Sequence, residues 1–147
     1  MLLLLAIVAA SGSVSAQQIR DLSADESMGG HTLARHVGKT DAELAERLRR
    51  ERDISAASTY TDRAAAERSV GAALASGGRK LADWQSRSGR RPNLVLHYSE
   101  PSRRPIGRSL ERGHSQAVPC SRAIVVLRWQ DRSGRFYVLT SYPETDR

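Results

Sequence analysis

The sequence predicts an α+β domain in which N-terminal helices are followed by a twisted antiparallel sheet. Apolar residues recur at helical spacing as far as Trp84, whereas residues 93–98, 123–129 and 135–142 are short runs rich in aliphatic and aromatic side chains. The last two runs are separated by a short segment containing Gly134, which is typical of a β-hairpin. Helices grouped before strands favour an α+β fold, because a parallel sheet needs the two kinds of element to alternate.

The start of the chain predicts a secretory signal peptide. An apolar run covers residues 2–10, and Val14 and Ala16 stand at the small-residue positions of a cleavage site. The run is too short to span a bilayer, which needs about 20 apolar residues. No Lys or Arg precedes the run, so a buried N-terminal helix is the alternative. We expect a signal-like segment over residues 1–16 and one domain over residues 17–147.

A short helix is expected over residues 31–37, ended by Gly38. On such a helix Leu33 and Val37 lie one turn apart and face the core, and His36 borders their apolar side. The residues before this helix are mostly polar and are expected to lead into the fold.

The next helix begins with a capping box, in which Thr40 is the N-cap and Glu43 follows three residues later. It is expected to run to about Asp53, with Leu44 and Leu48 as its apolar stripe. The charged residues on its other sides indicate an ordinary solvated face.

The middle of the chain predicts two further helical segments and a long loop. Residues 58–62 are interpreted as a break before a helix whose apolar period runs from Ala65 to Leu74 and ends at a pair of glycines. A further helical turn follows, with Trp84 as a core anchor. Residues 100–119 are rich in Pro, Gly, Ser and Arg and are therefore expected to form a loop.

The composition favours a single basic domain that binds a polyanion. The 147 residues suit one domain, and 23 Lys and Arg against 16 Asp and Glu give a net charge of +7. Most of the positive charge is arginine, whose planar guanidinium suits phosphate. Nucleic acid or an anionic membrane is the expected partner, and a solubilising surface without a specific partner is the alternative. Cys120 is the single cysteine, which excludes an intrachain disulfide.

The first candidate site residues are His31, His36 and Lys39, next to glycines that allow a close backbone approach. An imidazole exchanges protons near neutral pH, so His36 is a candidate acid or base, and a histidine that merely borders the core is the alternative. Arg47 either stabilises charge in a transition state or covers the apolar stripe of its helix with its stem.

The last strand holds the second group of candidates. A side-chain period of two places Phe136, Val138, Thr140 and Tyr142 on one face of this strand. The hydroxyl groups of Thr140 and Tyr142 then point the same way, which suits recognition of a phosphodiester or a base edge. The alternative is that Tyr142 lies at the edge of the core and that Thr140 is present as a strand former.

The chemistry expected of these residues needs no metal and no cofactor. The four histidines match no standard zinc spacing, and the sequence contains no Walker loop, serine-nucleophile elbow or two-metal carboxylate cluster. A phosphodiesterase built from His, Arg, Thr and Tyr would act without metal and take its nucleophile from the substrate. RNA carries such a nucleophile in its 2′-hydroxyl group, and DNA does not.

From roughly Asp25 to Pro143 the chain resembles the bacterial ribonuclease-A-like toxin domain, found at the C-terminal ends of contact-dependent growth-inhibition proteins. Six segments carry the resemblance in the right order: GGHTLARHVGKTDAELAERL, ASTYTDRAAAE, LADW, PIGRSLERG, AIVVLRW and FYVLTSYP. The resemblance implies a fold like that of pancreatic ribonuclease without its disulfides.

The resemblance also implies the active-site residues. The family has a histidine, an arginine eleven residues later and a Thr-x-Tyr pair near the end, which match His36, Arg47, Thr140 and Tyr142. His36 would act as general base or acid, and Arg47 would stabilise charge on the phosphorane-like transition state. The second acid or base stays open among His31, Lys39 and Tyr142.

The implied function is metal-independent cleavage of RNA, including tRNA, to a 2′,3′-cyclic phosphate. The implied biology is that of an exported antibacterial toxin, monomeric, acting in the cytoplasm of a target cell and neutralised by a cognate immunity protein. The rival hypothesis is a non-catalytic exported basic protein that binds RNA or an anionic surface, with binding that weakens steeply as salt rises.

Overall fold

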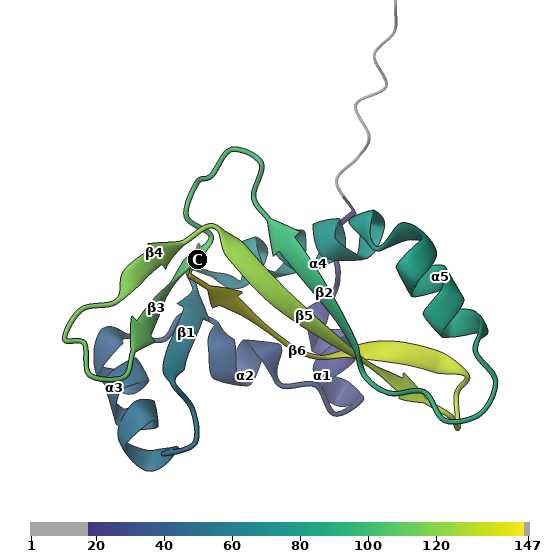
Figure 1. Cartoon of the computed structure of the whole chain (residues 1–147), viewed down its shortest axis with the longest axis horizontal. Coiled ribbons are helices and arrows are strands. Elements are labelled where there is room, and N and C mark those ends of the chain that lie inside the picture. Colours follow the sequence, from purple (N-terminus) through teal and green to yellow (C-terminus); the bar gives the residue numbers. More distant parts are fainter. Residues whose placement is uncertain (1–17, 146–147) are drawn as a thin grey trace, which may run out of the picture.

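Two three-stranded antiparallel sheets form the framework of the protein (Figure 1). The computed structural model describes residues 18–145, so the predicted signal-like segment over residues 1–16 lies outside the described residues. The first sheet has the order β1–β3–β4, formed by Ala56–Tyr60, Gly107–Glu111 and Val118–Cys120. The second has the order β2–β5–β6, formed by Leu94–Ser99, Arg122–Gln130 and Arg135–Glu144.

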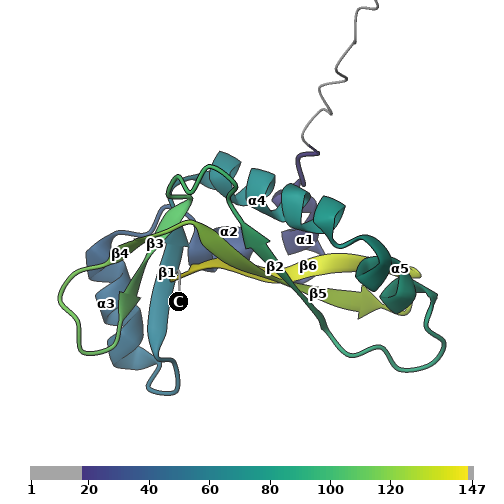
Figure 2. The same cartoon turned by 45° about the horizontal axis from the view of Figure 1, so that its top comes forward.

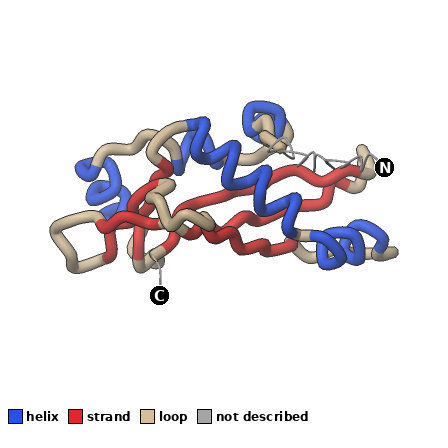
Figure 3. Tube along the Cα trace, turned by 90° about the horizontal axis from the view of Figure 1, so that it is seen from above, coloured by secondary structure: helices blue, strands red, loops and turns tan. Residues whose placement is uncertain are grey.

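Five helices within residues 18–145 surround these sheets. They are α1 (Leu22–Ser27), α2 (Thr32–His36), α3 (Asp41–Arg50), α4 (Arg63–Ser76) and α5 (Gly78–Ser86). Helix α3 lies at one end of the molecule beside β1 and β3, and α5 lies at the other end (Figure 2). Helix α4 runs across the second sheet (Figure 3). None of the helices in this part of the chain is long and apolar enough to cross a membrane.

The main core lies between α4 and the second sheet. Val70 on α4 packs against the alternate residues Val125 and Leu127 of β5, and all three are fully buried. Trp84 on α5 joins this cluster, and its indole N–H donates a hydrogen bond to the Pro92 carbonyl oxygen at 2.7 Å. The predicted role of Trp84 as a core anchor is therefore confirmed.

A smaller core joins α3 to the first sheet. Leu44 and Leu48 on α3 pack with Ala57 and Leu110, as the predicted apolar stripe requires. The helix starts with the predicted capping box, in which the Thr40 side chain accepts from the Glu43 backbone N–H and the Glu43 carboxylate accepts from the Thr40 backbone N–H.

Two sequence expectations about helix length need small corrections. Helix α3 ends at Arg50 and not at Asp53, because Glu51 already has an extended backbone. Residues 18–28, expected only to lead into the fold, contain α1, whose Leu22 is fully buried. Helix α2 ends as expected before Gly38, whose φ of +65° lies in the left-handed region that favours glycine.

Two segments expected to be irregular are strands. The break predicted over residues 58–62 is wrong, because most of it belongs to β1, and the loop predicted over residues 100–119 contains β3 and β4. Strands β1 and β3 pair antiparallel, with Ser58 opposite Ser109. Both serines are buried. Strands are predicted from β-branched and aromatic residues, and small polar residues at these buried positions do not give that signal.

A β-bulge interrupts the pairing of β5 with β6. Leu127 pairs with Val138 and the preceding residue of β5, Val126, pairs with Thr140, so Leu139 has no partner across the ladder. An extra residue in one strand shifts the alternation of its side chains by one position.

Because of the bulge, the four residues predicted to share one face of the last strand lie on two different faces. Phe136 and Val138 lie on the face that packs in the main core. After the bulge, Thr140 and Tyr142 lie on the opposite face and line a surface hollow instead. The prediction of one face for all four residues is wrong, whereas its pairing of Thr140 with Tyr142 is confirmed.

The outer edge of β6 is held by the first two helices. Hydrogen bonds run from the Val138 N–H to the Asp25 carboxylate, from the His31 N–H to the Leu139 carbonyl, and from the Ser141 N–H to the Thr32 hydroxyl oxygen, at 2.9, 3.0 and 2.9 Å. They satisfy backbone groups that an edge strand would otherwise leave unpaired. The position of β6 therefore depends on residues more than 100 positions earlier in the chain.

We expect Asp25→Ala to destabilise the fold. The buried Asp25 carboxylate accepts hydrogen bonds from Val138 and, at 2.6 and 2.8 Å, from the Arg20 guanidinium. Its removal leaves a buried N–H and a half-buried cation without their partner, at a cost of about 3 kcal/mol. Urea unfolding measures the difference. Asp83→Ala on the exposed side of α5 is the control, and an equal effect of the two variants would contradict this role of Asp25.

Candidate active site

A hollow of about 440 Å³ opens where β1 and β3 of the first sheet meet β6 of the second. Helices α2 and α3 contribute to its walls as well. Five of the six residues proposed from the sequence line it: His31, His36, Arg47, Thr140 and Tyr142. The fold therefore brings together side chains that are up to 111 positions apart in the sequence (142 − 31 = 111).

Lys39 lies elsewhere. It does not line this hollow and instead borders a neighbouring one between α2 and α3. Its backbone N–H is fixed by the Thr59 hydroxyl oxygen at 3.0 Å.

His36 is held in one orientation at the end of α2. Its side chain is 6% exposed, and its Nδ1 lies 3.2 Å from the backbone carbonyl oxygen of Ser58. A carbonyl oxygen only accepts hydrogen bonds, so Nδ1 carries the proton and Nε2 keeps a free lone pair. The Tyr142 ring lies beside the imidazole, with 5.4 Å between ring centroids.

Burial is the main cause of an unusually low pKa for His36, which falls from 6.5 to about 4. The positive charges of Arg47 and Arg35 and the neighbouring His31 lower this pKa further, while the hydrogen bond to Ser58 opposes the shift. His36 is therefore neutral at pH 7 and can accept a proton.

Three buried polar atoms on residues that line the hollow have no hydrogen-bond partner within the described part of the chain. One is Oε1 of Glu144, which lies 3.2 Å from the Arg122 guanidinium, and the other two are Nη1 of Arg47 and the hydroxyl oxygen of Thr140. The Nε of Arg47 is fixed by the Glu51 carboxylate at 3.2 Å, which leaves Nη1 available to a ligand. Buried polar groups without partners are costly, so this pair indicates a site for an anion that accepts hydrogen bonds.

Two further residues of the hollow, Tyr142 and His31, also have shifted pKa values. Burial raises the pKa of the half-buried Tyr142, and the charge of Glu144 raises it further, so this phenol keeps its proton at neutral pH. Burial also lowers the pKa of His31, and the charge of Arg35 adds to the effect. The hollow therefore holds the neutral imidazole of His36, the imidazole of His31, a guanidinium and the hydroxyl groups of Thr140 and Tyr142, with two carboxyl groups also in its lining.

Sequence reasoning missed the parts of the site that come from β1 and β3. Ser58 supplies the carbonyl that orients His36, and Ser109 is among the residues that line the hollow. No local pattern could reveal the role of Ser58, because it acts through its backbone and only the β1–β3 pairing places it there. Asp53 and Glu144 also line the hollow.

Over residues 18–145, no three His, Cys, Asp or Glu side chains group closely enough to hold a metal ion. What the hollow offers instead is a buried base, a guanidinium and hydroxyl groups, all on side chains. Such a set, on a basic α+β scaffold, is typical of proteins that act on phosphodiesters.

Comparison with known proteins gives the family. The model of the bacterial CdiA-CT RNAse A domain matches residues 30–143, so the chain belongs to this family of ribonuclease toxin domains. A crystal structure of a CdiA-CT/CdiI complex from Y. kristensenii has a chain with 30% sequence identity and a TM-score of 0.68, covering 78% of this chain and 99% of that one. No curated protein matches the sequence. The predicted α+β fold and ribonuclease activity are both confirmed.

The low pKa of His36 predicts a loss of stability in acid. Between pH 6.5 and 4 the unfolded chain binds a proton at this position and the folded protein does not, so the free energy of unfolding falls as the pH falls. The decrease from neutral pH to pH 4 amounts to about 3 kcal/mol. Urea unfolding across this range measures it against His36→Asn, which keeps a donor near Ser58 but does not titrate. Parallel curves for the two proteins would show that the His36 pKa is not lowered.

Proposed function

We propose that this ribonuclease cleaves RNA without a metal ion, using the 2′-hydroxyl group of the substrate as the nucleophile. The observation that carries the proposal is the combination, in one hollow, of a neutral His36 with the unpartnered polar atoms of Arg47 and Thr140. The first group suits removal of a proton, and the other two suit the oxygens of a phosphate.

In the proposed reaction, Nε2 of His36 removes the proton of the 2′-hydroxyl group. The 2′-oxygen then forms a bond to phosphorus as the bond from phosphorus to the 5′-oxygen breaks. The products are a 2′,3′-cyclic phosphate and a 5′-hydroxyl end. Arg47 and Thr140 donate hydrogen bonds to the non-bridging oxygens, where negative charge grows in the transition state.

We assign the proton of the leaving 5′-oxygen to Tyr142. Its phenol is protonated at neutral pH and its ring lies beside that of His36. His31 is the less suitable donor because its pKa is lowered, and Lys39 lies outside the lining of the hollow. His31 then contributes through the backbone N–H that fixes β6 at Leu139.

The biological setting that we propose follows that of the family. The similar crystal structure is a complex of CdiA-CT with CdiI, and we infer that a cognate immunity protein likewise binds and neutralises this chain. We further propose that the domain acts as a monomer on RNA, tRNA included, in the cytoplasm of a target cell after export.

Cleavage of total bacterial RNA in the presence of EDTA tests the mechanism. Residues 17–147 are expected to cut RNA and leave cyclic-phosphate ends, and His36→Ala is expected to lower the rate by roughly 10²–10⁴-fold because the base is lost. His114→Ala, at an exposed loop position, is the matched control. Salt-sensitive RNA binding without turnover by the unaltered protein would instead support a non-catalytic binding protein.

Thr140→Val separates function from stability. This nearly isosteric change removes a buried hydroxyl without a hydrogen-bond partner, so the free energy of unfolding should stay the same or rise by up to about 1 kcal/mol. The kcat/KM for RNA should fall by about 10–100-fold, because a donor to the transition state is lost. Urea unfolding and initial rates give the two values. A marked loss of stability together with full activity would contradict the role assigned to Thr140.

A further inference from the structure

A second hollow, of about 570 Å³, lies beside the first and is formed by α2, α3 and the segment between them. Arg47 lines both hollows. We propose that this second hollow, the α2–α3 hollow, is a phosphate subsite that binds the RNA phosphate adjacent to the one being cleaved. The inference rests on the proposed function, since it places the scissile phosphate in the first hollow.

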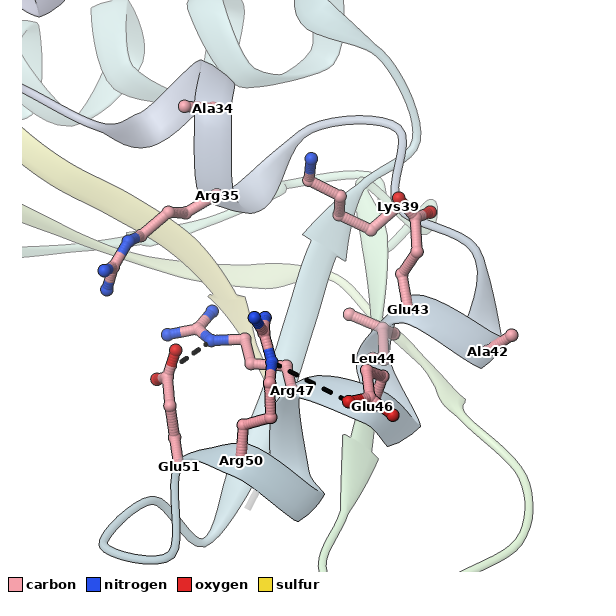
Figure 4. Close-up of a pocket in the computed structure, with 10 residues that line it drawn as sticks. All are labelled: Ala34, Arg35, Lys39, Ala42, Glu43, Leu44, Glu46, Arg47, Arg50 and Glu51. Atoms are coloured by element: carbon pink, nitrogen blue, oxygen red, sulfur yellow. Dashed lines mark hydrogen bonds and ion pairs between the residues drawn. The ribbon is translucent and has the colours of Figure 1, made fainter.

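Four cationic side chains border the α2–α3 hollow. Figure 4 shows Arg35 reaching from α2 while Arg47 and Arg50 reach from α3, so that their guanidinium groups face the space between the helices, with Lys39 above it. Planar guanidinium groups and an ammonium group from different elements are the donors that bind a phosphate group.

Two of these cations are free to bind a ligand. Arg47 is paired with Glu51 at 3.2 Å and Arg50 lies 3.9 Å from Glu46, whereas Arg35 and Lys39 form no ion pair with any described residue. The acidic side chains of the hollow have partners within or next to α3. Glu43 closes the capping box, Glu46 pairs with two arginines of α3, and Glu51 pairs with Arg47.

A third hollow, of about 580 Å³, adjoins the first through shared residues of β1 and the end of β6, and it too is lined by arginines. The guanidinium of Arg112 donates to the carbonyl oxygens of Glu51 and Ile54, and Arg122 pairs with Glu144 at 3.2 Å. Because these cations are already bound, the free positive charge beside the catalytic hollow lies on the α2–α3 side.

Charge links the proposed subsite to catalysis. The positive charges of Arg35 and Arg47 both contribute to the low pKa of His36. A phosphate bound between these two arginines would offset their charge and raise the pKa of His36 towards its ordinary value. Filling the subsite would thus make His36 a stronger base when RNA is in place.

Binding of short oligonucleotides that cannot be cleaved tests the subsite independently of turnover. The probes are a dinucleotide with 2′-deoxyribose at the scissile position and the two trinucleotides that extend it by one nucleotide on either side. We expect one trinucleotide to bind the unaltered protein roughly tenfold more tightly than the dinucleotide, as a charge-assisted contact to one more phosphate would give. NMR titration at low salt measures each Kd.

The double variant Arg35→Gln/Lys39→Gln should reduce this tenfold gain to less than twofold. The control Arg79→Gln/Arg90→Gln removes the same charge from exposed positions at the α5 end of the molecule and should keep the gain. The subsite is overturned if neither trinucleotide binds more tightly, or if the two double variants behave alike. Failure of RNA cleavage in EDTA would instead contradict the proposed mechanism, while the difference in Kd would still decide whether the subsite exists.

Discussion

The arrangement of the site depends on how the outer edge of β6 is bonded to α1 and α2. The Asp25 carboxylate and the Thr32 hydroxyl accept the backbone N–H groups of Val138 and Ser141 on either side of the bulge at Leu139. These bonds stabilise the shifted alternation that turns Thr140 away from the main core and towards His36. A regular strand would direct the Thr140 hydroxyl to the apolar side of the sheet, away from the hollow that contains His36.

Ser141, whose backbone N–H is bonded to Thr32, also joins the two sheets through its side chain. Ser141 on β6 forms a 2.6 Å hydrogen bond with the hydroxyl group of Tyr60 on β1, and both side chains are fully buried. Strand β1 in turn supplies the Ser58 carbonyl that orients His36. The position of the imidazole and that of the Thr-x-Tyr pair are thus set by one connected network and not by two independent halves of the molecule.

Burial gives the site its chemical character and also makes it costly to maintain. Because His36 is buried near several cations, it is neutral at physiological pH. The buried Nη1 of Arg47 and hydroxyl oxygen of Thr140 have no hydrogen-bond partner among the described residues, which is energetically costly. A bound polyanion would supply hydrogen-bond acceptors to these two atoms. It would also offset the positive charge near His36. Arg47 connects the two hollows, because it lines both the one that contains His36 and the α2–α3 hollow.

The sequence by itself determined the α+β class, the capping box of α3 and the β5–β6 hairpin, and it selected His36, Arg47, Thr140 and Tyr142 as candidates, which the structure places in one hollow. Periodicity, caps and family motifs are local patterns. Only the tertiary structure decided that β1 and β3 are strands, that a bulge lies at Leu139 and that Lys39 falls outside the hollow lined by the other candidate residues. These features depend on pairing between distant segments and on burial, which no short stretch of sequence encodes.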